Sequence, residues 1–382
     1  MTSRHWVLLS NEFPPIRHGG IGTVSSELAK RWLAAGDAVS LVGTFKDEDA
    51  KTLVNHWNSE RFTLVKVPQT PVPSYTLNEH LLRLRINWQL RRLAAQRQVD
   101  GLIVGDYRGM LPWGLGTRYR GRVAVRLAGS NLVYDHLLKR PRTALIHRFE
   151  RQTIQRASKA FAPSKFALEQ TALHVGLRDD QNPTVIPNGI DLAPFQAVPW
   201  QPIRGQIVFV NSIGPRKGVI ELLQALPDIV KAVPDANILL CGRRVAGFTE
   251  FEHTLNSLPE SSRSRVREVG WIDRENDLPR LLAESNLACL PSHLETFGVS
   301  AVEAMAAGCP LIYGDCGPTR ELVRHGLNGL ICDPHDHRDI ARKVIHVLTD
   351  PDLGIRLSKN AKAASLDYCA KKFTNRVSSL FD

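Results

Sequence analysis

Two glutamates, Glu295 and Glu303, stand eight positions apart in the stretch PSHLETFGVSAVEAMAAG, residues 291–308. The apolar run LACLPS before them predicts a strand, and the residues from Gly298 onward predict a helix. Ligands of open α/β sheets bind beyond the carboxyl ends of strands, where helix N-termini present unpaired amides. We therefore expect an anionic diphosphate to bind against the amides of Phe297, Gly298 and Val299.

Each glutamate, taken singly, also has a plain structural interpretation. An acidic residue before a helix is often a cap, and one inside a helix is often solvated. Glu303, however, is flanked by Val302, Ala304 and Met305 in a helix that is apolar nearly all round. An unpaired carboxylate would be costly there, so a buried contact with a ligand explains Glu303 better.

The rest of the chain predicts an α/β fold that can place such a site. Short runs rich in Val, Ile and Leu alternate with segments of helical periodicity, as in parallel β-α-β units. At 382 residues the chain exceeds the roughly 250–300 residues of a single core, so we expect two doubly wound domains. We predict strands at 5–10, 39–44, 62–67, 101–105, 123–128, 159–163, 184–187, 207–213, 237–243, 266–271, 287–292, 310–315 and 329–334.

The segment 187–205 is rich in proline and glycine and has little periodicity, so we interpret it as an interdomain linker. We accordingly predict an N-terminal domain over 1–195 and a C-terminal domain over 196–365. The last residues, about 366–382, predict an amphipathic helix that packs back onto the first domain.

The stretch 291–308 resembles the Glu-x7-Glu signature of the large fourth family of retaining glycosyltransferases. That family has the GT-B fold, in which two Rossmann-like domains face each other across a cleft. The segment 10–42 is similar to the family's first strand, glycine loop and first helix, and NGIDLAPF and GPRKG resemble two further landmarks in the same order. The likeness therefore runs the length of the chain.

The resemblance implies that the C-terminal domain binds the donor, a nucleotide sugar, and that the N-terminal domain lies on the acceptor side. It also implies roles for individual residues on the donor side. Glu303 would bind the ribose hydroxyls and Glu295 the donor sugar, while Lys217 and Arg216 would neutralise the leaving diphosphate. Gly19 and Gly20 would let the backbone approach the diphosphate closely. Alone, Lys217 would pass for a surface residue and the glycine pair for a turn. The other residues expected to bind the donor are Ser212, Arg243 and Ile272.

The chain departs from the family pattern at two positions. Ala128 stands where related sequences often have a histidine that contacts the donor sugar, and Ser212 stands where many have an arginine that holds phosphate. Arg216 is expected to replace that arginine. On the acceptor side we expect the first site residues at the end of the strand GLIVGD. The acceptor-side candidates are Asp106, Tyr107, Arg126 and Ser130.

The resemblance also implies a reaction without a metal or cofactor. The leaving group would be stabilised by cations and amides, with retention at the anomeric carbon. The segment 47–49 has the Asp-x-Asp form of a metal motif, but we predict it to be a solvated loop. The donor expected from the family is a UDP-hexose, with glucose first.

Basic residues are concentrated in the first half: residues 1–190 contain 27 Lys and Arg against 15 Asp and Glu. The segment 77–99 predicts a helix on which Arg83, Arg91 and Arg92 lie among leucines and Trp88. This helix either packs its leucines on the core or lies on an anionic membrane. We favour docking, because a second basic cluster follows within 139–156.

A lipid-linked or other glycan acceptor in bacterial surface or exopolysaccharide synthesis would fit this surface. Since the first residues do not form a secretory signal and no apolar run is long enough to span a bilayer, we expect a cytoplasmic protein, peripheral at the inner face of the plasma membrane.

Several other functions were weighed against transfer. A UDP-sugar 2-epimerase shares the two-domain architecture and would also bind a nucleotide diphosphate. A non-catalytic nucleotide-sugar binder is suggested by Ala128. Nucleic acid is not expected as a partner, because no zinc finger, RNP-type strand or recognition helix is evident. An NAD dehydrogenase is disfavoured, because HGGIGTV does not fit G-x-G-x-x-G.

Overall fold

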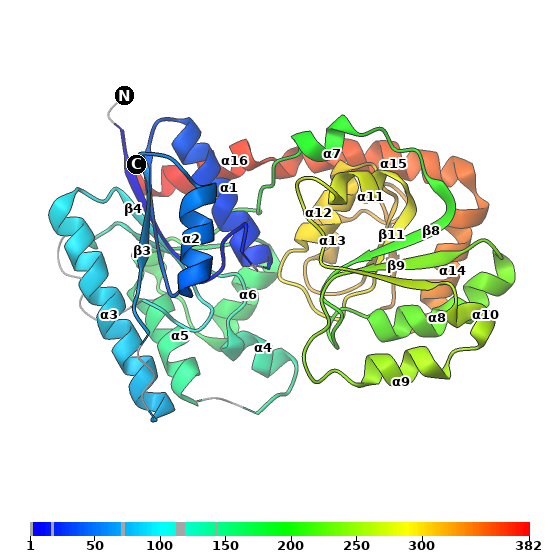
Figure 1. The fold of residues 1–382 in the computed structure, drawn as a ribbon, viewed down its shortest axis with the longest axis horizontal. Coiled ribbons are helices and arrows are strands. Elements are labelled where there is room, and N and C mark those ends of the chain that lie inside the picture. Colours follow the sequence, from blue (N-terminus) through cyan, green and yellow to red (C-terminus); the bar gives the residue numbers. More distant parts are fainter. Residues whose placement is uncertain (1–2, 17–18, 70–72, 112–118, 142–143) are drawn as a thin grey trace. The chain divides into compact units, whose positions relative to one another are not determined.

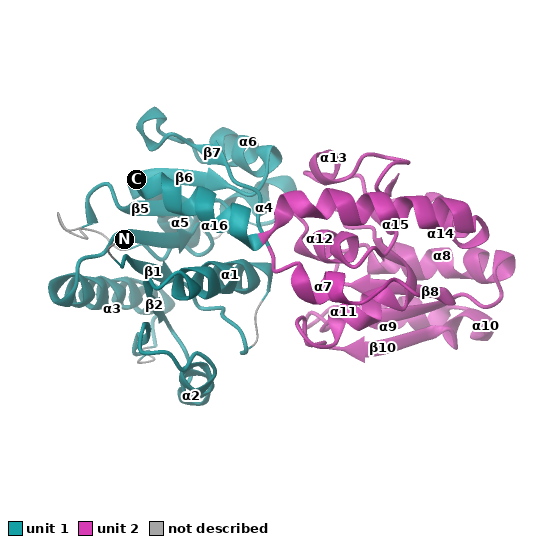
Figure 2. Ribbon diagram, turned by 90° about the horizontal axis from the view of Figure 1, so that it is seen from above, with its two compact units in different colours: residues 1–189, 370–382 teal, residues 190–369 magenta. Residues whose placement is uncertain are grey.

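The computed structural model describes residues 3–16, 19–69, 73–111, 119–141 and 144–382. The chain divides into two compact units, one formed by 1–189 with 370–382 and the other by 190–369 (Figures 1 and 2). Each unit is a parallel sheet with helices packed on it, which confirms the predicted α/β class with two Rossmann-like units.

The first unit is built on a seven-stranded sheet whose strands are all parallel, in the order β3-β2-β1-β4-β5-β6-β7. Its central strands are buried on both faces, as their continuous apolar runs require. The strands are β1 (His5–Leu9), β2 (Ala38–Gly43), β3 (Phe62–Lys66), β4 (Gly101–Gly105), β5 (Val123–Arg126), β6 (Lys159–Ala162) and β7 (Thr184–Val185).

The helices of the first unit include the last part of the chain. They are α1 (Gly20–Ala34), α2 (Asp47–His56), α3 (Tyr75–Gln96), α4 (Asn131–Leu137), α5 (Ala144–Arg156), α6 (Lys165–His174) and α16 (Ala370–Ser378), with short 3-10 turns at Asp179–Gln181 and Ser379–Phe381. Trp6 of β1 stacks on Trp32 of α1 with ring centroids 4.6 Å apart, and the Trp32 indole donates to Ser378 Oγ at 2.9 Å. Phe381 meets Trp6 edge-on at 5.5 Å. The end of the chain therefore closes over the β1–α1 pair.

The prediction of a solvated loop at 47–49 was wrong, because these residues form the first turn of α2. Three carboxylates there, Asp47, Glu48 and Asp49, lie next to the exposed amides and positive dipole end of the helix. Asp47 also forms an ion pair with Lys66. The run of three acidic residues is itself the sequence signal of a helix start.

The second unit has a six-stranded parallel sheet in the order β10-β9-β8-β11-β12-β13. The strands are β8 (Ile203–Val210), β9 (Asn237–Cys241), β10 (Val266–Gly270), β11 (Ser285–Leu290), β12 (Leu311–Gly314) and β13 (Leu330–Cys332). The helices are α7 (Ala193–Ala197), α8 (Val219–Ala232), α9 (Glu250–Ser257), α10 (Glu260–Arg263), α11 (Leu278–Ala283), α12 (Val299–Ala306), α13 (Thr319–Leu322), α14 (His337–Thr349) and α15 (Pro351–Ser365), with a 3-10 turn at Leu366–Tyr368.

The core of the second unit follows the two-residue period of the strands. Ile207 and Phe209 of β8 belong to the cluster that contains the apolar faces of α8 and α14, whereas Val208 and Val210 belong to the cluster around α12. Helices therefore cover both faces of the sheet, and the functional groups lie in the loops that leave its edge.

The strand order of each unit reverses at one point, between β1 and β4 in the first sheet and between β8 and β11 in the second. Loops that leave two neighbouring strands in opposite directions open a crevice at the carboxyl ends, where open α/β sheets bind ligands. None of the helices in the described part of the chain combines the length and the apolar character needed to cross a bilayer.

Candidate active site

An ion pair lies at the point where the strand order of the second unit reverses. Lys217 follows β8 and Glu295 follows β11, and Lys217 Nζ lies 2.5 Å from Glu295 Oε1. The hydroxyl of the buried Ser292 donates to the same carboxylate oxygen at 3.1 Å. Both charged side chains are largely shielded from solvent. The structure thus brings together two of the three predicted catalytic residues.

Backbone contacts hold the two loops of this ion pair in place. The amide of His293 donates to the carbonyl of Arg216 at 2.9 Å, so the loop after β11 is bonded to the loop after β8. Gly218 has a φ of 71°, and a Cβ at this position would overlap the carbonyl of Pro291. Glycine is therefore required where the two backbones meet, and Arg216, the third predicted catalytic residue, lies at the same junction.

Glu303 forms a second buried ion pair, with a partner that sequence reasoning missed. Its side chain is 2% exposed, and Arg274 Nε donates to Glu303 Oε1 at 2.9 Å while the other guanidinium nitrogen contacts Oε2. Burial raises the pKa of Glu303 above its usual value, and the Arg274 guanidinium opposes that rise. Glu303 is buried, as predicted, and Arg274 balances its charge within the unit, whereas the predicted contact with a ligand stays a prediction.

Arg274 lies in the loop that follows β10, 29 positions before Glu303. In the sequence it stands in the polar run DREND, where an arginine normally indicates a solvated turn. The available signal was the carboxylate inside the apolar helix, which requires a cation nearby but does not indicate which one.

The N-terminus of α12 presents the predicted diphosphate-binding amides. Gly298 caps the helix with a φ of 100°, and a Cβ there would overlap the Tyr313 hydroxyl. Phe297 is buried and meets Tyr368 edge-on, with ring centroids 5.8 Å apart. Val299 begins the helix. The left-handed turn at Gly298 leaves the first amides of α12 without intrahelical partners, as an anion site requires.

The remaining donor-side candidates lie at the ends of β8, β9 and β10. Ser212 is exposed in the loop after β8. Arg243 follows β9, is exposed, and has its guanidinium 5.9 Å from the ring centroid of Trp271. Ile272 is half-buried against the cluster around α12. All three therefore lie in loops at the carboxyl edge of the sheet.

In the first unit, Gly19 and Gly20 begin α1 after the loop that leaves β1. Gly19 is the N-cap residue, and its amide donates to Glu12 Oε2 at 3.0 Å. Both glycines are exposed. The helix start therefore has exposed backbone, and the Glu12 carboxylate accepts a hydrogen bond from one of its amides.

The acceptor-side candidates Asp106, Arg126 and Ser130 are all buried. Asp106 accepts hydrogen bonds from the amides of Ala128 and Gly129 at 3.1 and 3.2 Å. Burial, and secondarily the charge of Glu150, raise the pKa of Asp106 to about 7. Asp106 thus fixes the loop at the position where a histidine was expected.

Arg126 and Ser130 have partners within the first unit. Arg126 donates to Asn188 Oδ1 at 3.1 Å, and burial lowers its pKa to about 10. Ser130 caps α4 by accepting the amide of Val133 at 3.2 Å. Tyr107 is the exposed member of the candidate set, with 43% of its surface accessible.

A buried carboxylate that sequence reasoning did not single out, Glu150, organises this edge of the sheet. Its oxygens accept from the amides of Arg108, Asn131 and Leu132 at 2.9, 2.9 and 2.8 Å. Burial raises the pKa of Glu150, and these amides oppose the rise. Glu150 thereby joins the loop after β4 to the start of α4.

Arg83 was predicted to lie on a basic helical surface, and that prediction was wrong. The side chain is buried and donates to the carbonyls of Gly109 and Arg108, at 2.9 and 2.6 Å, and to Glu79 at 2.9 Å. Its burial follows from the loop after β4, whose carbonyls need donors. The basic surface of α3 must therefore be formed by other residues.

The two parallel sheets, with a charged pair at the strand reversal of the second, define a two-unit α/β protein of the GT-B type. A model of glycosyl transferases group 1 matches residues 195–364, and a model of glycosyltransferase family 4 matches residues 18–194. The chain belongs to the glycosyltransferases that these two models describe.

Known proteins agree with this assignment. The chain is 33% identical over 182 residues to the glycogen synthase of Mycobacterium tuberculosis, a match that covers 47% of this chain and 43% of that protein. The chain spans less than half the length of the curated relatives it matches.

Solved structures are similar over almost the whole chain. HepE of Anabaena in complex with UDP and glucose has a TM-score of 0.76 at 20% identity, with 98% of both chains covered. Sucrose-phosphate synthase of Thermosynechococcus elongatus has a TM-score of 0.78 at 19% identity, with 99% of this chain and 98% of that chain covered. At these identities the likeness concerns the fold.

Proposed function

We propose that the protein is a retaining, metal-independent glycosyltransferase that moves a hexose, with glucose as first choice, from a UDP-sugar to a glycan or lipid-linked glycan. The observation that carries this proposal is the shielded Lys217–Glu295 pair at the strand reversal of the second unit. Such a pair is a pre-formed site for a ligand that supplies both an anion and a hydroxyl.

The pair would exchange partners when the donor binds. The diphosphate would form an ion pair with Lys217 and accept hydrogen bonds from the amides of Gly298 and Val299. A sugar hydroxyl would donate to the carboxylate of Glu295 that this frees. The bond between the anomeric carbon and the diphosphate oxygen then breaks, and the electron pair leaves with UDP. Lys217 and Arg216 stabilise that developing charge. The acceptor oxygen bonds to the same face, and its proton passes to the departing phosphate.

Glu303 would bind the ribose, with Arg274 as its positioning residue. A buried carboxylate makes stronger hydrogen bonds to hydroxyls than a solvated one, provided that it stays ionised. The bidentate contact with Arg274 favours the ionised form of Glu303 and holds its side chain in one orientation. The ribose hydroxyls would then donate to a carboxylate that is already oriented, without a reorganisation cost.

The names of the similar proteins support a glucose nucleotide as donor. HepE was solved with UDP and glucose and also with UDP-glucose, and a glycogen synthase is among the curated relatives. Another structural neighbour is WaaG, a glycosyltransferase involved in lipopolysaccharide biosynthesis, which supports a lipid-linked glycan as the proposed acceptor. These likenesses support our proposal of a role in bacterial surface polysaccharide synthesis.

The donor proposal is tested by calorimetric titration of the full chain with UDP-glucose, UDP-galactose, UDP-N-acetylglucosamine, GDP-mannose and ADP-glucose. We expect one site per chain and tightest binding of a UDP-hexose. Lys217→Ala should weaken binding at least tenfold, whereas Lys231→Ala, an exposed lysine at the other end of α8, should not. Equal affinities of the two variants for UDP-glucose would contradict the proposed site.

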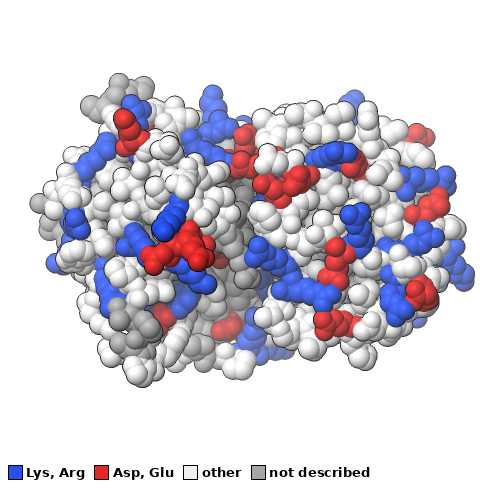
Figure 3. Space-filling model, viewed as in Figure 1, with Lys and Arg blue, Asp and Glu red and all other residues white. Residues whose placement is uncertain are grey.

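The acceptor would be presented at an anionic membrane by the exposed face of α3. Leu77, Leu84 and Trp88 are each about half exposed on this helix (49, 54 and 58%), and Arg92 lies 5.6 Å from the Trp88 ring centroid. Apolar and basic groups on one face match an interfacial helix. Figure 3 shows that on the visible face basic and acidic side chains are interspersed, so the proposed contact is local to α3.

Sedimentation with vesicles tests the membrane contact. We expect binding to vesicles with anionic lipid, weaker binding to phosphatidylcholine vesicles, and loss of the difference in Trp88→Ser/Arg92→Ser. A matched control changes the exposed Leu173 and Lys165 of α6 to serine. Equal weak binding of the unaltered protein to both vesicle types would contradict the membrane contact while leaving the donor site untested by that assay.

A further inference from the structure

Three metal-ligating side chains from separate segments of the second unit converge beside the candidate active site. Glu221 lies in the first turn of α8, His293 in the loop after β11 and His335 in the loop after β13. Each offers one ligand atom, and these atoms all lie within 4.8 Å of one another. Within the ranges that the structure describes, no other group of three such residues meets this condition.

Two of the three residues already form a pair. His293 Nε2 lies 3.1 Å from Glu221 Oε1, and both side chains are less than a fifth exposed. The His293 ring also bonds the carbonyl of Pro334. Histidines that bind metals usually donate one ring N–H to such a carbonyl, which orients the other nitrogen toward the ion. The Pro334 carbonyl that would orient His293 toward a metal therefore already contacts its ring.

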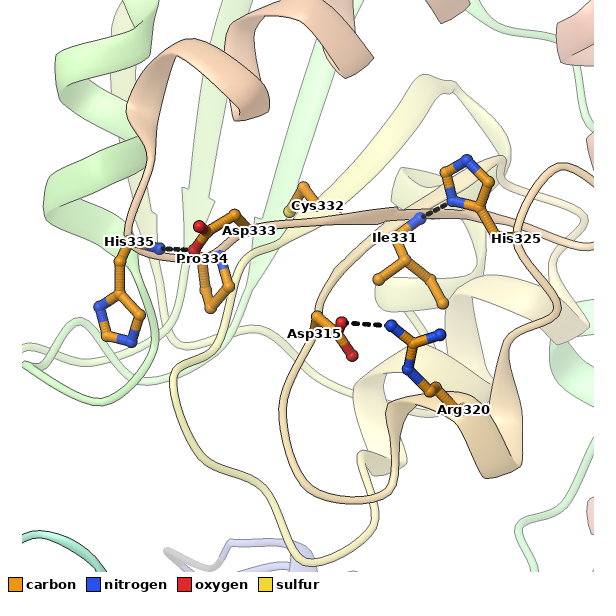
Figure 4. Close-up of a pocket in the computed structure, with 8 residues that line it drawn as sticks. All are labelled: Asp315, Arg320, His325, Ile331, Cys332, Asp333, Pro334 and His335. Atoms are coloured by element: carbon orange, nitrogen blue, oxygen red, sulfur yellow. Dashed lines mark hydrogen bonds and ion pairs between the residues drawn. The ribbon is translucent and has the colours of Figure 1, made fainter.

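His335 supplies the third ligand from a loop whose backbone is fixed. Its amide donates to Asp333 Oδ1 at 2.9 Å, whereas its imidazole is exposed. The rings of His293 and His335 lie 4.4 Å apart at their centroids, with an angle of 34° between them. Figure 4 shows His335 at one end of a pocket of about 440 Å³, away from His325 and Arg320 at the other end.

We propose that Glu221, His293 and His335 bind a Zn²⁺ ion that joins α8 to the loops after β11 and β13. Two imidazoles and one carboxylate are a ligand set that Zn²⁺ uses, whereas Mg²⁺ and Ca²⁺ take oxygen ligands. Coordination at about 2.0–2.1 Å would require the ligand atoms, which lie within 4.8 Å of one another, to move closer, and rotation of the exposed His335 side chain would supply part of that movement. Water would occupy the fourth position.

The site goes beyond the proposed transfer reaction, because the ion takes no part in it. Its effect is on position: Glu221 lies four residues after Lys217, and His293 lies two residues before Glu295. Zinc would hold together the two loops that already share the hydrogen bond from His293 to the Arg216 carbonyl. It would thereby stabilise the folded second unit.

The test uses the tag-free full chain, stripped with a chelator and titrated with ZnCl₂ or MgCl₂ in separate calorimetric experiments. We expect one Zn²⁺ per chain, no measurable Mg²⁺ binding, and a rise in Tm of about 5 °C or more at a hundredfold excess over Kd. X-ray absorption of the zinc complex should show two imidazole nitrogens at about 2.0–2.1 Å.

Substitutions identify the ligands. His335→Ala removes an exposed side chain, so the variant should fold normally and bind Zn²⁺ at least tenfold more weakly. Glu221→Gln should have a similar effect. His253→Ala, which removes an exposed histidine of α9, should bind like the unaltered protein. Equal Zn²⁺ affinities of the His335→Ala and His253→Ala variants, or absorption data without two imidazoles, would overturn the proposal. Neither result depends on transferase activity.

Discussion

Removal of the Arg274 guanidinium should destabilise the protein to an extent that depends on pH. Arg274→Met keeps much of the side-chain volume but leaves the carboxylate of Glu303, 2% exposed, without its cation. Breaking a buried ion pair on one side costs about 3–5 kcal/mol. Because about a quarter of the Arg274 side chain is exposed, water can reach the site, and we expect a loss of about 2–3 kcal/mol at pH 8.

The sign of the pH dependence follows from the pKa of Glu303. Burial already raises this pKa above 4.5, and the loss of Arg274 removes the interaction that lowers it. In the variant the folded protein therefore holds a proton that the unfolded chain releases near pH 4.5. The stability from that proton is complete below pH 4.5 and is lost as the pH rises through the folded pKa. The difference from the unaltered protein should grow between pH 4.5 and 8.

Urea denaturation at pH 5 and pH 8 measures this effect, with Arg280→Met as a control for an exposed pair. Arg280 pairs with Glu284 on the surface, and its removal should change the free energy of unfolding by less than about 0.5 kcal/mol. The double variant Arg274→Met/Glu303→Gln should recover about 2 kcal/mol relative to Arg274→Met at pH 8. Equal losses at both pH values, without recovery in the double variant, would refute a charge balance between these residues.

Three further outcomes are expected. Gly298→Ala should lower Tm by several degrees and weaken UDP binding at least tenfold, because a Cβ at a φ of 100° overlaps the Tyr313 hydroxyl; unchanged calorimetric UDP affinity would contradict the amide site. Because the pKa of Asp106 is raised to about 7, the free energy of unfolding should fall as the pH rises from 5 to 8, by up to about 1.4 kcal/mol per pH unit. Asp106→Asn should remove this fall in urea denaturation. If the free energy of unfolding of the variant fell with pH as steeply as before, the burial of Asp106 as an acid would be contradicted. Glu295→Gln should reduce kcat for a UDP-hexose at least a hundredfold while UDP affinity changes less than fivefold, as measured by initial rates and calorimetry; an equal effect on both would place Glu295 on the diphosphate instead of the sugar.

Local sequence patterns predict much of the fold, because buried parallel strands consist of short apolar runs. The first four residues of the run IVFVNSI form the end of β8, which stops at Val210, and their alternate side chains pack on opposite faces of the sheet. The apolar run LACLPS likewise predicted a strand and the residues from Gly298 onward a helix, and the structure contains β11 and α12 at these places. Local periodicity suffices for such features.

Contacts between distant segments could not be predicted in this way. Arg274 and Glu303 meet only because β10 and β11 leave the same edge of one sheet. Arg83 was predicted to lie on a helix surface and Glu150 was not singled out, but each is buried against a loop whose backbone carbonyls or amides need partners. The strand order decides which loops meet, and no single segment encodes it.

The most direct test of the central claim is proton NMR of the anomeric signals while the protein acts on UDP-glucose. In the absence of an acceptor, slow transfer to water should release glucose and UDP in equal amounts, with the α anomer appearing first, before mutarotation. Lys217→Ala should slow this release at least a hundredfold, and Lys231→Ala should not change it. Release of the β anomer first would contradict retention. Conversion of UDP-glucose to another UDP-sugar would indicate an epimerase. The proposed transferase would be contradicted if neither UDP-glucose nor any other nucleotide sugar reacted, with or without glycan acceptors.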